Sequence, residues 1–137
     1  MLGSAVSDGI DWELVLQPEH PTGGFMVSIR SSVGPGPGMG KGVGRHLAGL
    51  VIGYLGSRDQ RIVALFGAVS ADFHHVRVEL VDGSELVADI VDARDELGVN
   101  LYVAIPPTQP VRLVFTDALQ NARFMEIQSA SEFDYRH

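Results

Sequence analysis

The chain contains no cysteine. A protein without thiols forms no disulfides and has no thiolate nucleophile, iron–sulfur cluster or cysteine-bound zinc. Cations are also scarce: 10 Lys and Arg residues are scattered along the chain against 17 Asp and Glu, and the net charge is −7. Proteins that bind nucleic acid by neutralising phosphates need clustered cations, so the sequence excludes that class of binding.

Long hydrophobic runs are missing as well. The longest apolar run, residues 47–55, has about half the length of a bilayer span and includes two glycines. The first nine residues lack the basic cluster and the apolar stretch of a signal peptide. We therefore expect no membrane insertion and a cytoplasmic chain, with an extracytoplasmic location left open.

What the sequence does contain is a series of short runs with the alternation typical of strands. Gly, Pro, Asp and Asn separate them, and only residues 92–97 could form a single helical turn. Such a pattern predicts an all-β fold, an immunoglobulin-like antiparallel sandwich of about seven to nine strands. We expect one domain over residues 1–137, with frayed ends at 1–9 and 129–137. The runs are Trp12–Gln17, Phe25–Ser31, Leu47–Leu55, Arg61–Val69, His74–Val81, Glu85–Val91, Val99–Ile105, Val111–Thr116 and Ala122–Gln128.

The turn at Asp82-Gly83 fixes the register of one hairpin. A loop with an even number of residues would bury the carboxylate of Asp89, whereas a three-residue loop, 81–83, sets Val78 against Leu86. The same loop gives Gly83 the left-handed conformation that such loops need. The sequence therefore predicts a positive φ at Gly83.

Glycine occupies every second position from 34 to 44, inside the stretch 31–45. Such a segment has almost no side chains to bury, so we expect a long mobile loop that trypsin cuts first at Lys41. A phosphate-binding loop is a poor match, because Pro35 and Gly42 stand where its glycine and its Ser or Thr would be.

His74-His75 is the only pair of adjacent histidines. Adjacent strand residues point to opposite faces, so we expect no shared metal ion. The predicted register puts His75 opposite Asp89 on the outer face and His74 on the inner face with Ile90. Trp12, the only tryptophan, is expected in the core.

An acidic group in the second half of the chain is the candidate metal site. Asp89, Asp92, Asp95 and Glu96 could offer oxygens to calcium at one end of a sandwich, but they lack the alternating Asp/Asn and Gly pattern of a calcium loop. Solvated charge on a turn is the favoured interpretation, and no cofactor is predicted.

The runs at 47–55 and 61–66 are apolar on both faces, whereas a strand in a two-layer sandwich needs only one buried face. A folded-over loop, another strand layer or a second copy must cover the other face. We expect a second copy, in a homodimer that buries part of Val51, Gly53, Leu55 or Val63.

A resemblance adds to this pattern. The stretches 66–72 (FGAVSAD) and 76–83 (VRVELVDG), followed by 98–102 (GVNLY), resemble uncharacterised immunoglobulin-like β-sandwich domains common in actinobacteria. The likeness covers residues 11–127, and it implies a fold without implying a site. Many such domains are extracytoplasmic or membrane-tethered, and some carry cysteines in the early strands, where this chain has residues such as Met26.

The sequence contains no catalytic motif that we recognise. We expect a non-catalytic module for protein interaction or assembly, with a protein partner or a second copy as its ligand. The alternative is a domain that binds a small ligand, a carbohydrate or calcium at one end of the sandwich. A deep pocket lined by Tyr54, His46 or Arg45 would favour this alternative, and a flat apolar patch would favour the first.

Overall fold

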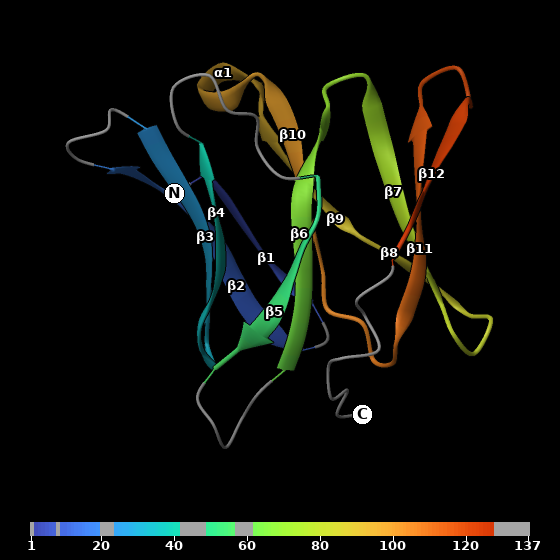
Figure 1. Ribbon diagram of the computed structural model, residues 1–137, viewed down its shortest axis with the longest axis horizontal. Helices are drawn as coiled ribbons and strands as arrows, with labels where there is room; N and C mark the ends of the chain where they lie inside the picture. The colour runs from blue at the N-terminus through green and yellow to red at the C-terminus, as the bar shows by residue number, and fades with distance from the viewer. Residues whose placement is uncertain (1, 8, 20–23, 42–48, 57–61, 128–137) are drawn as a thin grey trace.

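The computed structural model describes residues 2–7, 9–19, 24–41, 49–56 and 62–127. Over these segments the chain is all-β: twelve antiparallel strands form three four-stranded sheets (Figure 1). A short helix, α1 (Arg94–Leu97), confirms the single helical turn predicted at 92–97. No helix in the described segments is long and apolar enough to cross a membrane.

Each sheet has a simple strand order. The first is the meander β1-β2-β3-β4, with bounds Gly3–Ser7, Ile10–Glu19, Gly24–Ser31 and Gly34–Lys41. The second has the order β5-β6-β10-β9, with bounds Val51–Leu55, Ile62–Ser70, Val99–Ala104 and Asp89–Ala93. The third has the order β12-β11-β7-β8, with bounds Ala122–Glu126, Pro110–Asp117, Phe73–Leu80 and Glu85–Val87.

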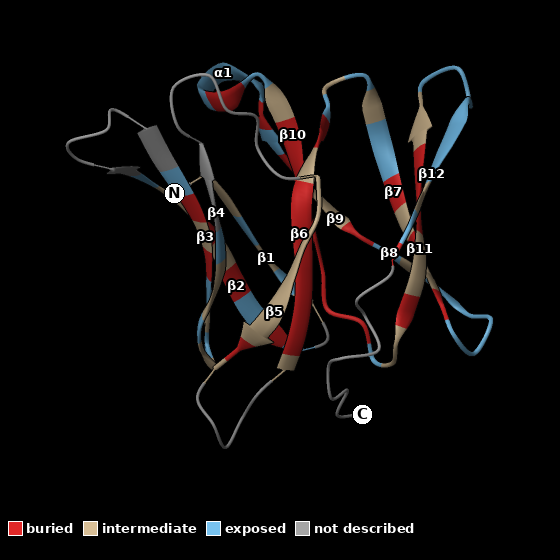
Figure 2. Ribbon diagram, in the orientation of Figure 1, coloured by how far each residue is buried: buried red, intermediate tan, exposed pale blue. Residues whose placement is uncertain are grey.

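The three sheets stack as layers, with the second sheet in the middle. One apolar cluster joins the first sheet to one face of the second, through Trp12, Leu14, Ile29, Phe66 and Leu101 among others. A separate cluster joins the opposite face of the second sheet to the third, through Leu65, Tyr102, Val78, Leu113 and Phe115 among others. Figure 2 accordingly shows β6 and β10 buried along most of their length.

This layering adds a third sheet to the two that the sequence predicts. The strands β5 and β6, which lie within the runs 47–55 and 61–69, are apolar on both faces because they belong to the middle layer, and another strand layer covers the second face. The nine predicted runs all contain strands. Strands β1 and β4 were not predicted, and the run 85–91 divides into β8 and β9, which pair with β7 and β10 in different sheets.

The glycine-rich segment is a strand over its described part, residues 34–41, and the expectation of a loop there is wrong. β4 pairs with β3 along its length, and two of its residues, Gly36 and Pro37, oppose the single residue Ile29. A Cβ atom on Gly36 would lie 2.4 Å from a methyl of Leu55 and 2.6 Å from one of Ile29. Glycine is needed here because β4 packs against its neighbours without room for a side chain. Residues 42–45 lie outside the described residues.

The N-terminal segment, which was expected to be frayed, forms a strand. Residues 3–7 form β1, which pairs with β2 and approaches β9 so closely that a Cβ on Gly3 would lie 2.6 Å from a methyl of Val91. The segment 129–137 lies outside the described residues.

The predicted hairpin is confirmed. Val78 pairs with Leu86, and the amide of Ala88 donates to the carbonyl of Val76 at 2.9 Å. Gly83 has φ +88°, as the three-residue loop requires. Val76, Val78 and Ala88 are buried in one cluster, with Leu86 packed against it.

Candidate functional site

The acidic residues considered for a metal site do not converge. Asp89 lies at the start of β9, where its carboxylate accepts a hydrogen bond from the Ser7 hydroxyl. Asp92 is held by Arg94 at 2.7 and 2.9 Å, and the hydrogen bonds from this guanidinium lower the pKa of Asp92 from 3.8 to about 2. Asp95 and Glu96 lie exposed on α1. No group of three or more acidic or histidine side chains within the described segments could hold a metal ion.

The residues expected at a dimer interface are largely internal. Leu55 is 0% and Val63 is 2% exposed. Val51 packs against the cluster between the first two sheets, and Gly53 lies so close to Pro37 of β4 that a Cβ on it would be 2.8 Å from the proline ring. The apolar face that suggested a homodimer is therefore covered within one chain.

The histidine pair is arranged differently from the expectation, because β7 contains a bulge. Phe73 pairs with Asp117 and His75 pairs with Thr116, which leaves His74 as an extra residue. The bulge turns both histidines outward, since Phe73 packs in the core while His74 and His75 are exposed. The predicted pairing of His75 with Asp89 is also wrong, because Asp89 pairs with Val103 in another sheet.

Both imidazoles line one surface concavity of 620 Å³ at this end of the third sheet. Two charged side chains in the same lining already have partners. Arg77 is paired with Glu85 at 3.0 Å. The Asp117 carboxylate accepts from the amides of Leu119 and Asn121, and the hydrogen bond from the Asn121 amide contributes most to lowering the pKa of Asp117.

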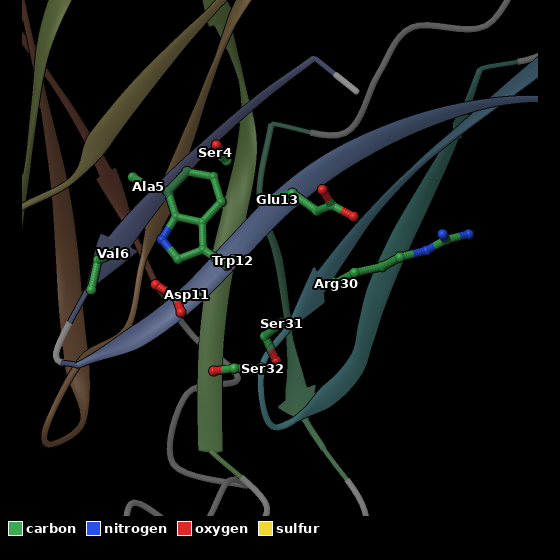
Figure 3. Close-up of a pocket in the computed structure, with 9 residues that line it drawn as sticks. All are labelled: Ser4, Ala5, Val6, Asp11, Trp12, Glu13, Arg30, Ser31 and Ser32. Atoms are coloured by element: carbon green, nitrogen blue, oxygen red, sulfur yellow. The ribbon is translucent and has the colours of Figure 1, made fainter.

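A second concavity, of 440 Å³, lies on the first sheet (Figure 3). Its lining residues are Ser4, Ala5, Val6, Asp11, Trp12, Glu13, Arg30, Ser31 and Ser32. Trp12 is 2% exposed and donates its indole N–H to Ser7, so the tryptophan is a core residue as predicted. Figure 3 shows the Arg30 side chain extending away from the indole ring. The charged lining residues are Asp11, Glu13 and Arg30, and their side chains do not converge on a common point.

The outer face of the third sheet carries an exposed aromatic ring. In one cross-strand row, Phe124 pairs with Val114, Val114 with Arg77, and Arg77 with Val87. Phe124 is 59% and Val87 is 61% exposed, whereas Val114 between them is 0% exposed. Phe124 is the only exposed Phe, Tyr or Trp among the side chains that the structure describes.

Charged side chains hold this row in place. The Arg112 guanidinium lies 4.6 Å from the centre of the Phe124 ring and also binds both oxygens of Glu79, at 2.6 and 2.9 Å. The hydrogen bonds from Arg112 lower the pKa of Glu79. Sequence reasoning missed this surface, although the alternation in residues 122–127 contains a signal: Met125 and Ile127 share the inner face, which leaves Phe124 outside.

Comparisons of the chain with protein-family models, with curated proteins and with solved structures find no match. The resemblance to actinobacterial β-sandwich domains therefore stays a prediction.

Proposed function

We propose that the protein is a non-catalytic protein-binding module built on an immunoglobulin-like sandwich. Two strand orders support the immunoglobulin-like sandwich. The order β5-β6-β10-β9 matches A-B-E-D of immunoglobulin-like domains, and the order β12-β11-β7-β8 matches G-F-C-C′. In this interpretation strands β5 to β12 form the sandwich, and the meander β1–β4 is an added layer on the outer face of its A-B-E-D sheet.

The exposed ring of Phe124 is the observation that carries the proposed binding role. Aromatic and arginine side chains are enriched in the contacts that dominate protein interfaces. Arg112 and the buried Val114 already restrict the ring, so binding would order little additional structure. A partner with an apolar patch bordered by charged groups would complement Phe124 and the ion pairs Arg112–Glu79 and Arg77–Glu85.

The test compares proteins captured from native lysate by the wild type and by two variants, with identification by mass spectrometry. Phe124→Ser should lose the captured partner. Leu119→Ser is the matched control, because Leu119 is 82% exposed but lies on the turn between β11 and β12. It should retain the partner. Equal capture by both variants, with thermal melts close to the wild type, would overturn the assignment of this face.

A second copy is a possible partner, and the same variants test it. Light scattering of the wild type at micromolar concentration measures the mass. A dimer that Phe124→Ser converts to a monomer would identify self-association through the third sheet. A dimer that survives the substitution would place the interface elsewhere.

The histidine concavity favours a second candidate function, the binding of a small ligand at one end of the sandwich. The supporting observation is the bulge that turns His74 and His75 into the same 620 Å³ concavity. A thermal-shift screen of divalent ions, sugars and small anions should then give a hit that His74→Ala and His75→Ala both abolish. A screen without such a hit would remove this candidate.

A further inference from the structure

The edge strands of the three sheets are covered to different degrees. β4 lies against β5, where the amide of Gly56 donates to the carbonyl of Pro35 at 2.9 Å. β8, one edge of the third sheet, has only three residues. The other edge, β12, has five residues and lies at the outer margin of the third sheet (Figure 1). Its exposed residues are Ala122, Arg123, Phe124 and Glu126.

The pairing of β12 with β11 shows which backbone groups of β12 are free. The amide of Ile127 donates to the carbonyl of Val111 at 3.0 Å, and the two strands pair in an unbroken antiparallel register. In such a pair the backbone groups of every second residue point toward the neighbouring strand. The amides and carbonyls of Ala122, Phe124 and Glu126 therefore point away from β11. An edge of this kind can pair with an extended segment of another protein.

The side chains on the outer face restrict what such a segment contains. Phe124 is 59% exposed beside the buried Val114, so its ring offers contact to an apolar side chain directly opposite. Glu126 lies beside Arg112, but the Arg112 guanidinium already binds both oxygens of Glu79. Glu126 has no ion-pair partner among the side chains that the structure describes, so it favours a cation opposite it.

We propose that β12 binds an extended segment of another protein as an added antiparallel strand, with an apolar residue opposite Phe124 and a lysine or arginine opposite Glu126. Antiparallel pairing continues the pattern of the third sheet and is slightly more stable than parallel pairing. Because the added strand runs in the opposite direction, its cation precedes its apolar residue by two positions in the partner sequence. This inference rests on the proposed protein-binding function and specifies how the partner is bound.

A second copy of the chain meets these requirements less well. β12 has no lysine or arginine on its outer face, where Ala122, Phe124 and Glu126 lie, so self-pairing leaves Glu126 without a cation. Arg123 is on the inner face, with its guanidinium 6.0 Å from the centre of the Phe73 ring. The net charge of −7 also opposes self-association, and it attracts a basic segment.

The probe is the peptide acetyl-Thr-Lys-Thr-Ile-Thr-Thr-amide, in which the lysine and the isoleucine would lie opposite Glu126 and Phe124. The full chain is titrated with this peptide and followed by backbone amide NMR. The signals of β12 should shift and saturate, with a Kd on the order of 0.1 to 1 mM, since a short flexible peptide loses entropy when it is ordered.

Two methylated peptides test the backbone hydrogen bonds in the wild-type chain. Methylation of the isoleucine nitrogen removes a donor that faces β12, so it should weaken binding by at least about tenfold. Methylation of the next nitrogen, on the following threonine, is the matched control. That nitrogen faces away from β12, and binding should change by less than about threefold.

A charge exchange tests the register. Glu126→Lys should weaken binding of the lysine peptide by at least about fivefold, and a peptide with glutamate in place of lysine should bind this variant more tightly than it binds the wild type. Glu96→Lys is the matched control, because Glu96 is exposed on α1 and should change the affinity by less than about twofold. Loss of both peptides by Glu126→Lys, with a thermal melt like that of the wild type, would overturn the pairing at Glu126.

The remaining outcomes separate this inference from the proposed function. Equal binding of the two methylated peptides would overturn strand addition, and loss of binding in Phe124→Ser would then still support the proposed function. No saturable shift with the lysine peptide would also overturn the inference, while the comparison of captured proteins still tests the proposed function. A dimer that Phe124→Ser dissociates and the peptide does not would assign this edge to a second copy and overturn the peptide partner.

Discussion

Strands β4 and β7 have the same period of two but use it in opposite ways. β7 places Val76, Val78 and Leu80 on its inner face, so its own side chains fill the core. In β4 the packed position is a glycine, Gly36, and the side chains of Leu55 and Ile29 fill the space that a side chain there would need. The bulge at Gly36 and Pro37 shifts the alternation of β4, so that Gly38 is exposed. A strand can therefore pack closely through a glycine as well as through apolar side chains of its own.

The strongest test of this comparison adds a side chain to β4. Gly36→Val should lower the free energy of unfolding by about 3 kcal/mol, since the new atoms would collide with Leu55 and Ile29. Urea unfolding measures the loss. Gly38→Val is the control: a Cβ there lies at least 3.3 Å from its neighbours, and the position is exposed, so the cost should stay below about 1 kcal/mol. Equal costs at both positions would contradict the close packing of β4.

The reverse test removes a side chain from β7. Val78→Ala should destabilise the protein by about 2 kcal/mol, because Val78 is 0% exposed and the truncation leaves a cavity between the second and third sheets. Val81→Ala, at a position 58% exposed, should cost less than about 0.5 kcal/mol. If the two variants unfold at the same urea concentration, Val78 does not contribute to the core as described.

A smaller effect is expected at the hairpin turn that follows β7. Gly83→Val should cost about 1 kcal/mol, because its φ of +88° is unfavourable for a branched side chain. Gly83→Asn should cost less, since asparagine tolerates left-handed backbone better than valine does. Thermal unfolding of both variants measures the difference, and a reversed order would argue against the three-residue loop.

The smallest effect is expected at the exposed ion pair Arg94–Asp92, which lies outside both β4 and β7. Arg94→Gln should raise the pKa of Asp92 from about 2 toward 3.8, because the guanidinium hydrogen bonds are lost. The sign follows from the depressed pKa. The pair stabilises the wild type above about pH 4, and this contribution disappears as the pH falls toward 2. A carboxyl NMR titration measures the pKa, and Arg77→Gln should leave it unchanged.

Local features of the sequence were sufficient to place many elements. The nine alternating runs each contain a strand, and the Asp82-Gly83 turn gave the correct pairing of Val78 with Leu86. The burial of Trp12 was also predicted correctly. These features depend on residues that are neighbours in the chain, where alternation and turn geometry act directly.

The candidate sites depended on contacts that local patterns do not encode. His74 and His75 share a face because of a bulge opposite Thr116 and Asp117, some forty residues away along the chain. Asp89 left the predicted hairpin because the chain crosses between sheets after Val87. The ring of Phe124 is held by Arg112 of the neighbouring strand. A single sequence contains no direct record of such long-range pairings.

The sequence by itself therefore determined that the chain is all-β, where most strands lie, and that the runs at 47–55 and 61–66 must be covered on both faces. Tertiary structure decided what covers them. Of the loop, the strand layer and the second copy that were considered, the strand layer β1–β4 is the one observed. The physical reason is the close approach of β4 to β5. Glycine at position 36 leaves room for Leu55, and only the folded chain brings these two residues together.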